Sequence, residues 1–198
     1  MAEHSRYSAG SDEGKILQNK LGIRDQEILN DVETILFSDA YGHFFELQKK
    51  NLFKFDSKLI FEIHKYTLGT LYEWAGSIRI VDISKDGMLF CPSSQIRKNL
   101  ELFEKVLKKN LPTREDSKAY VAEKLAVVHC EFIAIHPFRE GNGRTIRLFL
   151  DLLAVGSGFK SIDYTKSSPE LYIDGCRAGM MQDYLKMQKV MYRGLTER

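Results

Sequence analysis

Residues His136 to Arg147, HPFREGNGRTIR, place an imidazole, a carboxylate, a Gly-Asn-Gly turn and two arginines close together. Gly141 and Gly143 permit unusual φ angles and let backbone N–H groups converge on an anion. The helix expected to follow adds the partial positive charge of its N-terminus. Arg144 and Arg147 are three residues apart, so they share a face of that helix and can bind phosphate oxygens. The pattern predicts a site for a phosphate-containing ligand.

Two ionisable residues flank this turn. Glu140 would repel a phosphate unless a cation lies between them, and Mg²⁺, which prefers oxygen ligands, resolves that conflict. His136 ends the preceding apolar segment and points toward the same space, where it can act as a general base. The alternative is an ordinary helix-turn-helix connection with a histidine cap. The spacing also differs from the GxxxxGK(S/T) of a Walker P-loop.

The elements that position these residues are predicted to be helices. Asp25 can cap a helix whose apolar positions Ile28, Val32 and Ile35 recur at helical spacing. A second helix runs from about Asp56 to EWAG, residues 73–76. Further helices are predicted over about 96–107, 121–135, 144–153 and 168–191, the last with Ser168 as its cap and Pro169 as its first residue.

Residues 78–90 carry the one convincing β signal. A β-branched arm, 78–83, and an apolar arm, 88–90, flank Asp86-Gly87, which tolerates the positive φ of a tight turn. Since two strands alone are marginally stable, we expect a flap that rests on helices. The predicted fold class is mainly α with a single β-hairpin.

The composition favours a globular protein of one domain. The chain has 198 residues, of which 43% are apolar and 28% charged. A net charge of +2 with dispersed basic residues does not favour direct binding to nucleic acid or to a membrane surface. The three cysteines are far apart, which excludes a disulfide framework, and the N-terminus lacks an apolar signal segment. We therefore expect a cytoplasmic protein.

The string HPFREGNGRTIR resembles the signature of the Fic (filamentation induced by cAMP) family, HxFx(D/E)GNGRxxR, at every specified position. YEWAGSIRIVDIS, residues 72–84, resembles the flap region of that family. The resemblance implies a Fic-type helical bundle with a single β-hairpin flap near the active-site loop. It implies one domain over 1–198, with a flexible segment 1–14, an N-terminal helical extension 15–50 and a Fic core 51–192. Most members transfer AMP from ATP to a hydroxyl group of a target protein.

The resemblance also implies a role for each motif residue. His136 would deprotonate the target hydroxyl, and Phe138 would lock the loop into the core. Glu140 would bind Mg²⁺ that bridges the α- and β-phosphates of the co-substrate ATP. The hydroxyl would attack the α-phosphorus, and pyrophosphate would leave.

The remaining motif residues would hold the nucleotide. The resemblance assigns the phosphates to Asn142, to the amides of Gly141 and Gly143 and to Arg144. It pairs Arg147 with the γ-phosphate. The motif does not specify the base, so a Fic-type transferase with a different nucleotide or phosphate-containing donor is one alternative. A non-catalytic nucleotide-binding module is another, although the intact histidine argues against it.

By the same resemblance, the flap would pair with an extended segment of the target through main-chain hydrogen bonds. Its residues are Ile83, Ser84, Lys85, Asp86, Gly87, Met88, Leu89 and Phe90. The alternative is a hairpin that only covers the core, and Lys85 is as readily a solvated turn residue as a contact for the target. His129 and His64 are predicted to be structural, because no metal-ligand spacing accompanies them. Tyr72 and Trp74 are predicted to be core residues.

The short chain and its LQNKLGI segment resemble the bacterial toxin branch of the family. This implies the bacterial topoisomerases DNA gyrase or topoisomerase IV as the target, with self-modification as a further possibility. It also implies the bacterial cytoplasm as the location, with secretion as an effector left open.

Many Fic proteins are inhibited by a helix with the motif (S/T)xxxE(G/N), whose glutamate pairs with the second arginine, here Arg147. Only Glu13 and Glu140 precede Gly or Asn in this chain; Ala9 stands four residues before Glu13, and Glu140 belongs to the active motif. We therefore expect a separate small antitoxin to carry the inhibitory helix and to dock around residues 17–36. The alternative is a degenerate inhibitory segment that uses Glu13.

Overall fold

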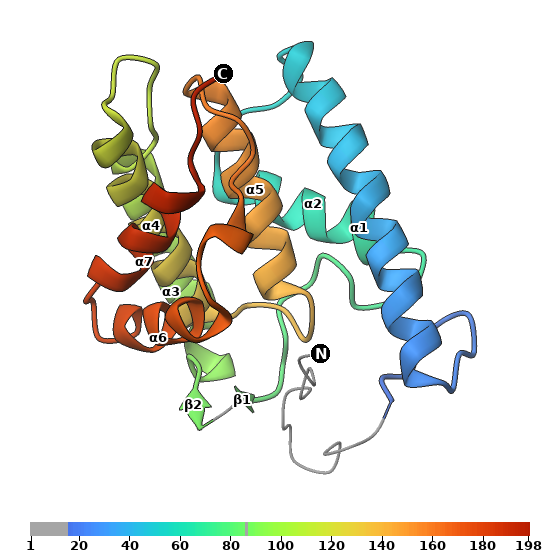
Figure 1. Cartoon of the computed structure of the whole chain (residues 1–198). Coiled ribbons are helices and arrows are strands. Elements are labelled where there is room, and N and C mark those ends of the chain that lie inside the picture. Colours follow the sequence, from blue (N-terminus) through green and yellow to red (C-terminus); the bar gives the residue numbers. More distant parts are fainter. Residues whose placement is uncertain (1–15, 86) are drawn as a thin grey trace.

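Helices form most of the protein (Figure 1), and the computed structural model describes residues 16–85 and 87–198. The helices are α1 (Gln26–Lys49), α2 (Ser57–Leu68), α3 (Ile96–Lys109), α4 (Lys118–Ile135), α5 (Asn142–Gly156), α6 (Pro169–Gly179) and α7 (Leu185–Gly194). Strands β1 (Ser84–Lys85) and β2 (Met88–Leu89) pair antiparallel, and short 3-10 turns lie at Ser93–Gln95 (η2) and Tyr164–Lys166 (η3). The predicted fold class, mainly α with a single small hairpin, is confirmed for the described residues.

Helix α4 is the centre of the bundle and packs against α3, α5, α6 and α7. Ser117 caps its N-terminus by accepting a hydrogen bond from the N–H of Tyr120. The whole predicted apolar stripe is buried, and so are residues on its other faces: Val121, Ala122, Leu125, Ala126, Val128, Cys130, Phe132 and Ile135. The C-terminal part of this helix is largely buried, which fixes the position of the residue that follows it, His136.

Helix α1 lies on one side of the molecule and packs against α2 and α5 (Figure 1). Asp25 caps it as predicted, by accepting hydrogen bonds from two backbone N–H groups. The buried face, however, is Leu29, Glu33, Phe37, Ala40 and Phe44. Ile28 and Ile35, from the predicted apolar stripe, are 54% and 67% exposed. The apolar pattern of the buried face is not evident in the sequence, because Glu33 interrupts it.

The β-branched arm 78–83 is not a strand, so that part of the hairpin prediction is wrong. The ladder joins only Ser84 with Leu89 and the residues next to them, while Ile80 is 91% exposed. The backbone of this arm is occupied elsewhere, since the N–H of Arg79 donates to the carbonyl of Pro137. Ile83 and Phe90 are both buried in the core, so the hairpin does rest on helices as expected.

Three predicted boundaries also shift. Helix α2 ends at Leu68, before EWAG, and α5 begins at Asn142, two residues before the predicted start. The predicted last helix is two helices, interrupted by a turn in which Gln182 has a φ of 62°. Within the part of the chain that the structure describes, no helix is long and apolar enough to cross a membrane. The predicted flexible segment 1–14 lies outside the described residues.

Candidate active site

His136 occupies a left-handed corner at the end of α4, with φ 50° and ψ 59°. Its ring is 3% exposed and stacks on Phe90, with 3.8 Å between the ring centroids. Nδ1 lies 3.1 Å from the carbonyl oxygen of Ile133, which can only accept, so the proton of the neutral ring belongs on Nδ1. Burial lowers the pKa of His136 to about 3, and the charge of Arg79 contributes to this. The imidazole is therefore neutral at pH 7, and its Nε2 is the nitrogen that can take a proton.

The loop after this corner is fixed by Phe138 and Asn142. Phe138 is fully buried and stacks on His64 at 3.8 Å between centroids. The buried Asn142 side chain accepts a 2.9 Å hydrogen bond from the N–H of Phe138 and donates a 2.8 Å bond to its carbonyl. Asn142 thus uses its side chain to close the loop, while its backbone N–H lies at the start of α5. The contact between Asn142 and phosphate stays a prediction.

His64 ties helix α2 to the same loop, as a structural histidine. Its Nδ1 accepts from the N–H of Gly76 at 2.8 Å, and its Nε2 donates to the carbonyl of Glu140 at 3.0 Å. Burial lowers its pKa to about 4, so the ring is neutral. Next to it, Gly141 has a φ of +80°, and a Cβ there would lie 2.8 Å from a methyl carbon of Leu68. Only glycine fits this position.

The backbone N–H groups of Asn142, Gly143 and Arg144 open helix α5. The first helical bond of α5 runs from the N–H of Thr145 to the carbonyl of Gly141, at 2.9 Å, so these three groups precede it. A Cβ built on Gly143 would meet no atom of residues 16–85 or 87–198 within 4 Å, so these residues leave free space beside this position. Gly143 is helical, however, so the unusual φ expected there is found only at Gly141. The arrangement suits an anion at the helix N-terminus.

Arg144 lies against helix α1. Its Nη2 atom is 2.6 Å from Oε2 of Glu33 and 3.7 Å from Oε1 of Glu140. The guanidinium also lies over the ring of Phe37, at 4.7 Å from its centroid. The first arginine of the motif is thus held by a helix that precedes the motif by about a hundred residues.

Arg147 lies close to η3 and α6. Its Nε donates to the carbonyl of Gly143 at 3.3 Å, and its guanidinium lies 5.6 Å and 6.0 Å from the ring centroids of Tyr164 and Tyr172. Although both arginines leave the start of one helix, their guanidinium groups have different neighbours. The binding of phosphate oxygens by both arginines stays a prediction.

Glu140 is the candidate metal ligand. Its Oε1 accepts a 2.8 Å hydrogen bond from the N–H of Gly141, which holds the carboxylate at the N-terminus of α5. Residues 16–85 and 87–198 contain no group of three or more acidic, His or Cys side chains that could hold a metal. Mg²⁺ commonly binds through one or two carboxylates together with substrate phosphates and water, so a single glutamate beside an anion site fits it.

His129 is a buried core residue, as predicted. Its Nε2 lies 2.8 Å from the hydroxyl oxygen of Tyr172, and burial lowers its pKa to about 3.

The predicted flap residues divide into two groups. Ile83 and Phe90 are buried anchors, and Phe90 covers the ring of His136. Ser84, Lys85 and Met88 are half-buried, Gly87 is exposed, and the side chain of Leu89 is 71% exposed. Asp86 lies outside the described residues. Of the described flap residues, Gly87 and Leu89 are therefore accessible to a partner, whereas the two anchors are not.

Arg79 is a site residue that the sequence analysis missed. Its Nε donates to the carbonyl of His136 at 2.8 Å, and Nη1 donates to Val81 at 2.6 Å. Nη2 donates to the carbonyls of Cys91 and Ile135. One buried guanidinium thus joins both arms of the flap to the corner that carries the histidine. The only signal in the sequence was a lone arginine within a β-branched segment.

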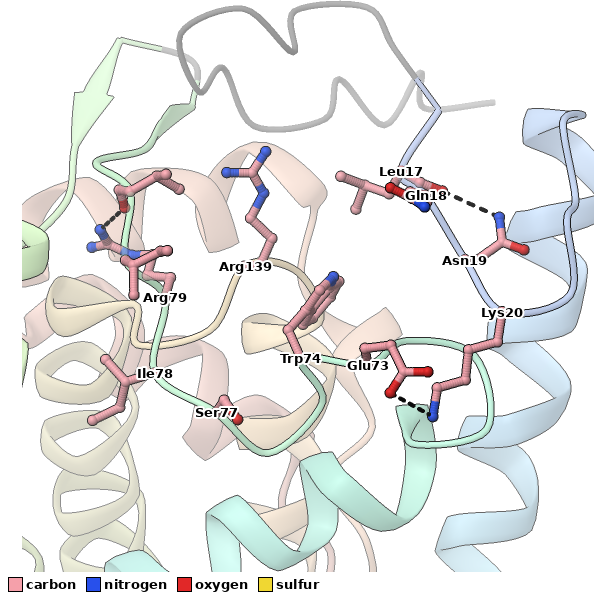
Figure 2. Close-up of a pocket in the computed structure, with 12 residues that line it drawn as sticks. Leu17, Gln18, Asn19, Lys20, Glu73, Trp74, Ser77, Ile78, Arg79 and Arg139 are labelled. Carbon is pink, nitrogen blue, oxygen red and sulfur yellow. Dashed lines mark hydrogen bonds and ion pairs between the residues drawn. The ribbon is translucent and has the colours of Figure 1, made fainter.

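A cavity of about 710 Å³ adjoins the loop (Figure 2). Arg139 of the motif points into it, and so does Trp74, which stacks on Tyr72 with 4.4 Å between centroids. Residues 17–20 and 77–81 form the other walls. Tyr72 is a buried core residue as predicted, and Trp74 packs against the same core cluster but is only half-buried and also lines this cavity.

Known proteins are similar to this chain in sequence and in fold. A sequence profile of the Fic/DOC family matches residues 54–154. Protein adenylyltransferase VbhT of Bartonella schoenbuchensis is 37% identical over 145 residues, which are 73% of this chain and 30% of VbhT. Probable protein adenylyltransferase y4lH of Sinorhizobium fredii is 31% identical over 160 residues, 80% of each chain. This chain therefore spans less than a third of VbhT and most of y4lH.

The fold matches that of a solved effector structure. BepC, a VirB-translocated effector protein from Bartonella tribocorum, was crystallised with bound AMPPNP. It superposes with a TM-score of 0.77 at 24% identity, over 93% of this chain and 95% of BepC.

Proposed function

Because the chain belongs to the Fic/DOC family, we propose that it is a protein adenylyltransferase, which moves AMP from ATP onto a hydroxyl side chain of a target protein. The observation that carries this proposal is a buried, neutral His136 beside the N-terminus of α5. A base and an anion site in one loop suit transfer of a phosphorus group to a hydroxyl. The relatives named adenylyltransferases and the AMPPNP bound to BepC support the choice of nucleotide.

In this reaction the target hydroxyl oxygen attacks the α-phosphorus of ATP. Nε2 of His136 takes the hydroxyl proton, and the bond to the bridging oxygen of pyrophosphate breaks, so pyrophosphate leaves. The N–H groups at the start of α5 and the guanidinium of Arg144 bind phosphate oxygens, while Arg147 serves the γ-phosphate. Catalysis then consists mainly of positioning and charge stabilisation.

Glu140 would hold Mg²⁺ at this site, where the ion offsets phosphate charge. Its carboxylate is already fixed by the N–H of Gly141 and lies beside Arg144. Without a cation, that carboxylate would repel the phosphates that the same helix terminus attracts.

ATP labelled either at the α- or at the γ-phosphate tests the reaction type. The purified chain is incubated with each label and with bacterial lysate, and proteins are separated by size. Transfer of the α label alone supports adenylylation and reveals the target band. Transfer of the γ label would indicate a kinase, and no transfer from ATP, with transfer from another nucleotide, would indicate a different donor.

We further propose that the chain is the toxin of a toxin-antitoxin pair, acting in the bacterial cytoplasm on DNA gyrase or topoisomerase IV. The tip of the hairpin is the expected contact for the target. A separate small antitoxin would dock around residues 17–36, where Ile28 and Ile35 present exposed apolar side chains, and would place a glutamate against Arg147.

Expression of the chain alone tests the toxin proposal, because an enzyme without its inhibitor should arrest the host. The lysate band must in addition belong to one of these two topoisomerases. A chain that is inactive alone, but active after Glu13→Gly, would place the inhibitor within the chain instead.

A further inference from the structure

Glu33 is a buried carboxylate in the middle of α1, only 2% exposed. Its Oε2 accepts a 2.6 Å bond from Nη2 of Arg144, and its Oε1 accepts from the hydroxyl of Tyr72. One turn further along α1, Phe37 supports the same guanidinium with its ring. Burial of a carboxylate charge is costly unless the charge is paired. The contacts with Arg144 and Tyr72 therefore fix the position of the Glu33 carboxylate.

We propose that Glu33 is a positioning residue for the proposed transfer reaction, and that it sets the orientation in which Arg144 meets the phosphates of the nucleotide. The proposal rests on the function proposed above. It adds a residue outside residues 54–154, the part that the family profile matches.

The geometry supports positioning because Glu33 holds Arg144 through one nitrogen. A guanidinium has five N–H donors, and the described bond to Glu33 uses one of them. The second N–H of Nη2 is not used by Glu33 and can still form, together with a neighbouring N–H of the same guanidinium, two parallel bonds to a phosphate. The carboxylate is itself held from the other side by Tyr72, a core residue that is 1% exposed. The guanidinium therefore has a fixed direction before any ligand arrives.

Loss of Glu33 would do more than loosen this side chain. Among the residues that the structure describes, the other carboxylate paired with Arg144 is that of Glu140, whose Oε1 is 3.7 Å from Nη2 of Arg144. Without Glu33, Arg144 should turn to Glu140 and form that ion pair. The pairing would remove the arginine from its place at the phosphates and would occupy the oxygen ligand proposed for Mg²⁺.

Glu33 differs from the inhibitory glutamate of the family pattern. Leu29 stands four residues before it and Thr34 follows it, so the (S/T)xxxE(G/N) motif is absent. It also contacts Arg144 and not Arg147. The two roles predict opposite effects, since removal of a positioning group weakens ATP binding and removal of an inhibitor strengthens it.

The experiment compares the wild-type chain with Glu33→Ala and Glu33→Gln, by calorimetric titration with Mg-ATP and by steady-state transfer of α-labelled AMP. We expect Glu33→Ala to weaken ATP binding about tenfold and to lower kcat/KM about 10- to 100-fold, as expected for a misplaced binding group. Glu33→Gln should lower ATP affinity and kcat/KM less than Glu33→Ala does, because its amide oxygen can still accept the hydrogen bond from Arg144. Some loss remains, because a hydrogen bond to a neutral acceptor is weaker.

Two matched variants separate positioning from stability and from net charge. Leu29→Ala removes a fully buried side chain from the same face of α1, so it should lower the melting temperature and leave the affinity for ATP unchanged. Asp31→Asn removes one exposed negative charge from the same helix and should change neither quantity.

Wild-type affinity in folded Glu33→Ala would overturn the proposal, and so would tighter binding with faster transfer, which would make Glu33 an inhibitor. Equal losses of affinity in Leu29→Ala would reduce Glu33 to a stabilising residue. If wild type transfers no α label but Glu33→Ala still weakens nucleotide binding, the proposed function fails while the positioning role stands.

Discussion

Replacement of Arg79 by methionine should destabilise the protein and loosen its histidine corner. The side chain of Arg79 is 0% exposed and donates to the carbonyls of Val81, Cys91, Ile135 and His136. Methionine reaches about as far as the Nε atom of arginine and has no donor, so these acceptors would lose their partner and the space of the guanidinium group would be vacated.

The size of the effect follows from those four carbonyls. A buried acceptor without a partner costs about 1–3 kcal/mol, which gives an upper range of about 4–12 kcal/mol for four. Relief from burying a guanidinium charge, and water that enters beside the flap, should offset most of this, so we expect a loss of about 2–4 kcal/mol. For a chain of this size that corresponds to a fall of about 4–16 °C in melting temperature.

Thermal unfolding followed by circular dichroism measures the loss of stability. AMP transfer, at a temperature where the variant is fully folded, measures the effect of the loosened histidine corner on activity. We expect transfer to fall about 100-fold, because small displacements of catalytic groups carry penalties of this order. Arg97→Met is the control, since Arg97 is an exposed residue of α3. If Arg79→Met melts within about 2 °C of wild type, the carbonyls have other partners and the reasoning is wrong.

Three further predictions concern ionisable residues. His136→Ala should slow AMP transfer by about 10² to 10⁴ while ATP binding stays close to wild type, because the base acts on the target hydroxyl; transfer assays and calorimetry measure the two. Glu140→Ala should abolish both transfer and its dependence on Mg²⁺, measured by a Mg²⁺ titration. The free energy of unfolding, measured by urea titration, should decrease as the pH falls from about 6.5 to 4. Burial lowers the pKa values of His64, His129 and His136 to about 4, 3 and 3, so in this range the unfolded chain binds protons at three imidazoles that the folded chain leaves neutral. Asp151, whose pKa burial raises to about 6, acts in the opposite direction but is a single group.

Each of these expectations has a contradicting result. Transfer at wild-type speed in the histidine variant would reduce that residue to a helix cap. Full activity of the wild-type enzyme in a chelator would exclude a role for the carboxylate in metal binding. Stability that rises on acidification from pH 6.5 to 5 would mean that the imidazoles are not buried as described.

The sequence was informative where one residue type has one common use. Capping residues such as Asp25 and Ser168, and the apolar face of α4, marked helices that the structure contains. Predictions from the sequence were wrong where a tertiary contact determined the local structure. Residues 78–83 have the composition of a strand, but the buried side chain and backbone of Arg79 bind the 136–137 corner and prevent a longer ladder. The sequence did not mark Glu33 as a site residue, because its partner lies 111 positions away.

The packing of α1 limits which part of this domain can be transferred into another protein. The matched segment 54–154 includes the motif, yet α1 covers the apolar residues Leu68, Leu71 and Tyr72, and α6 and α7 cover the far side of α4. A graft cut at the borders of that segment would carry the sequence signature but would expose both apolar surfaces and leave Arg144 without its carboxylate. The smallest portable piece therefore begins before α1 and ends after α7, so insertions and fusions in this lineage should be tolerated outside those borders.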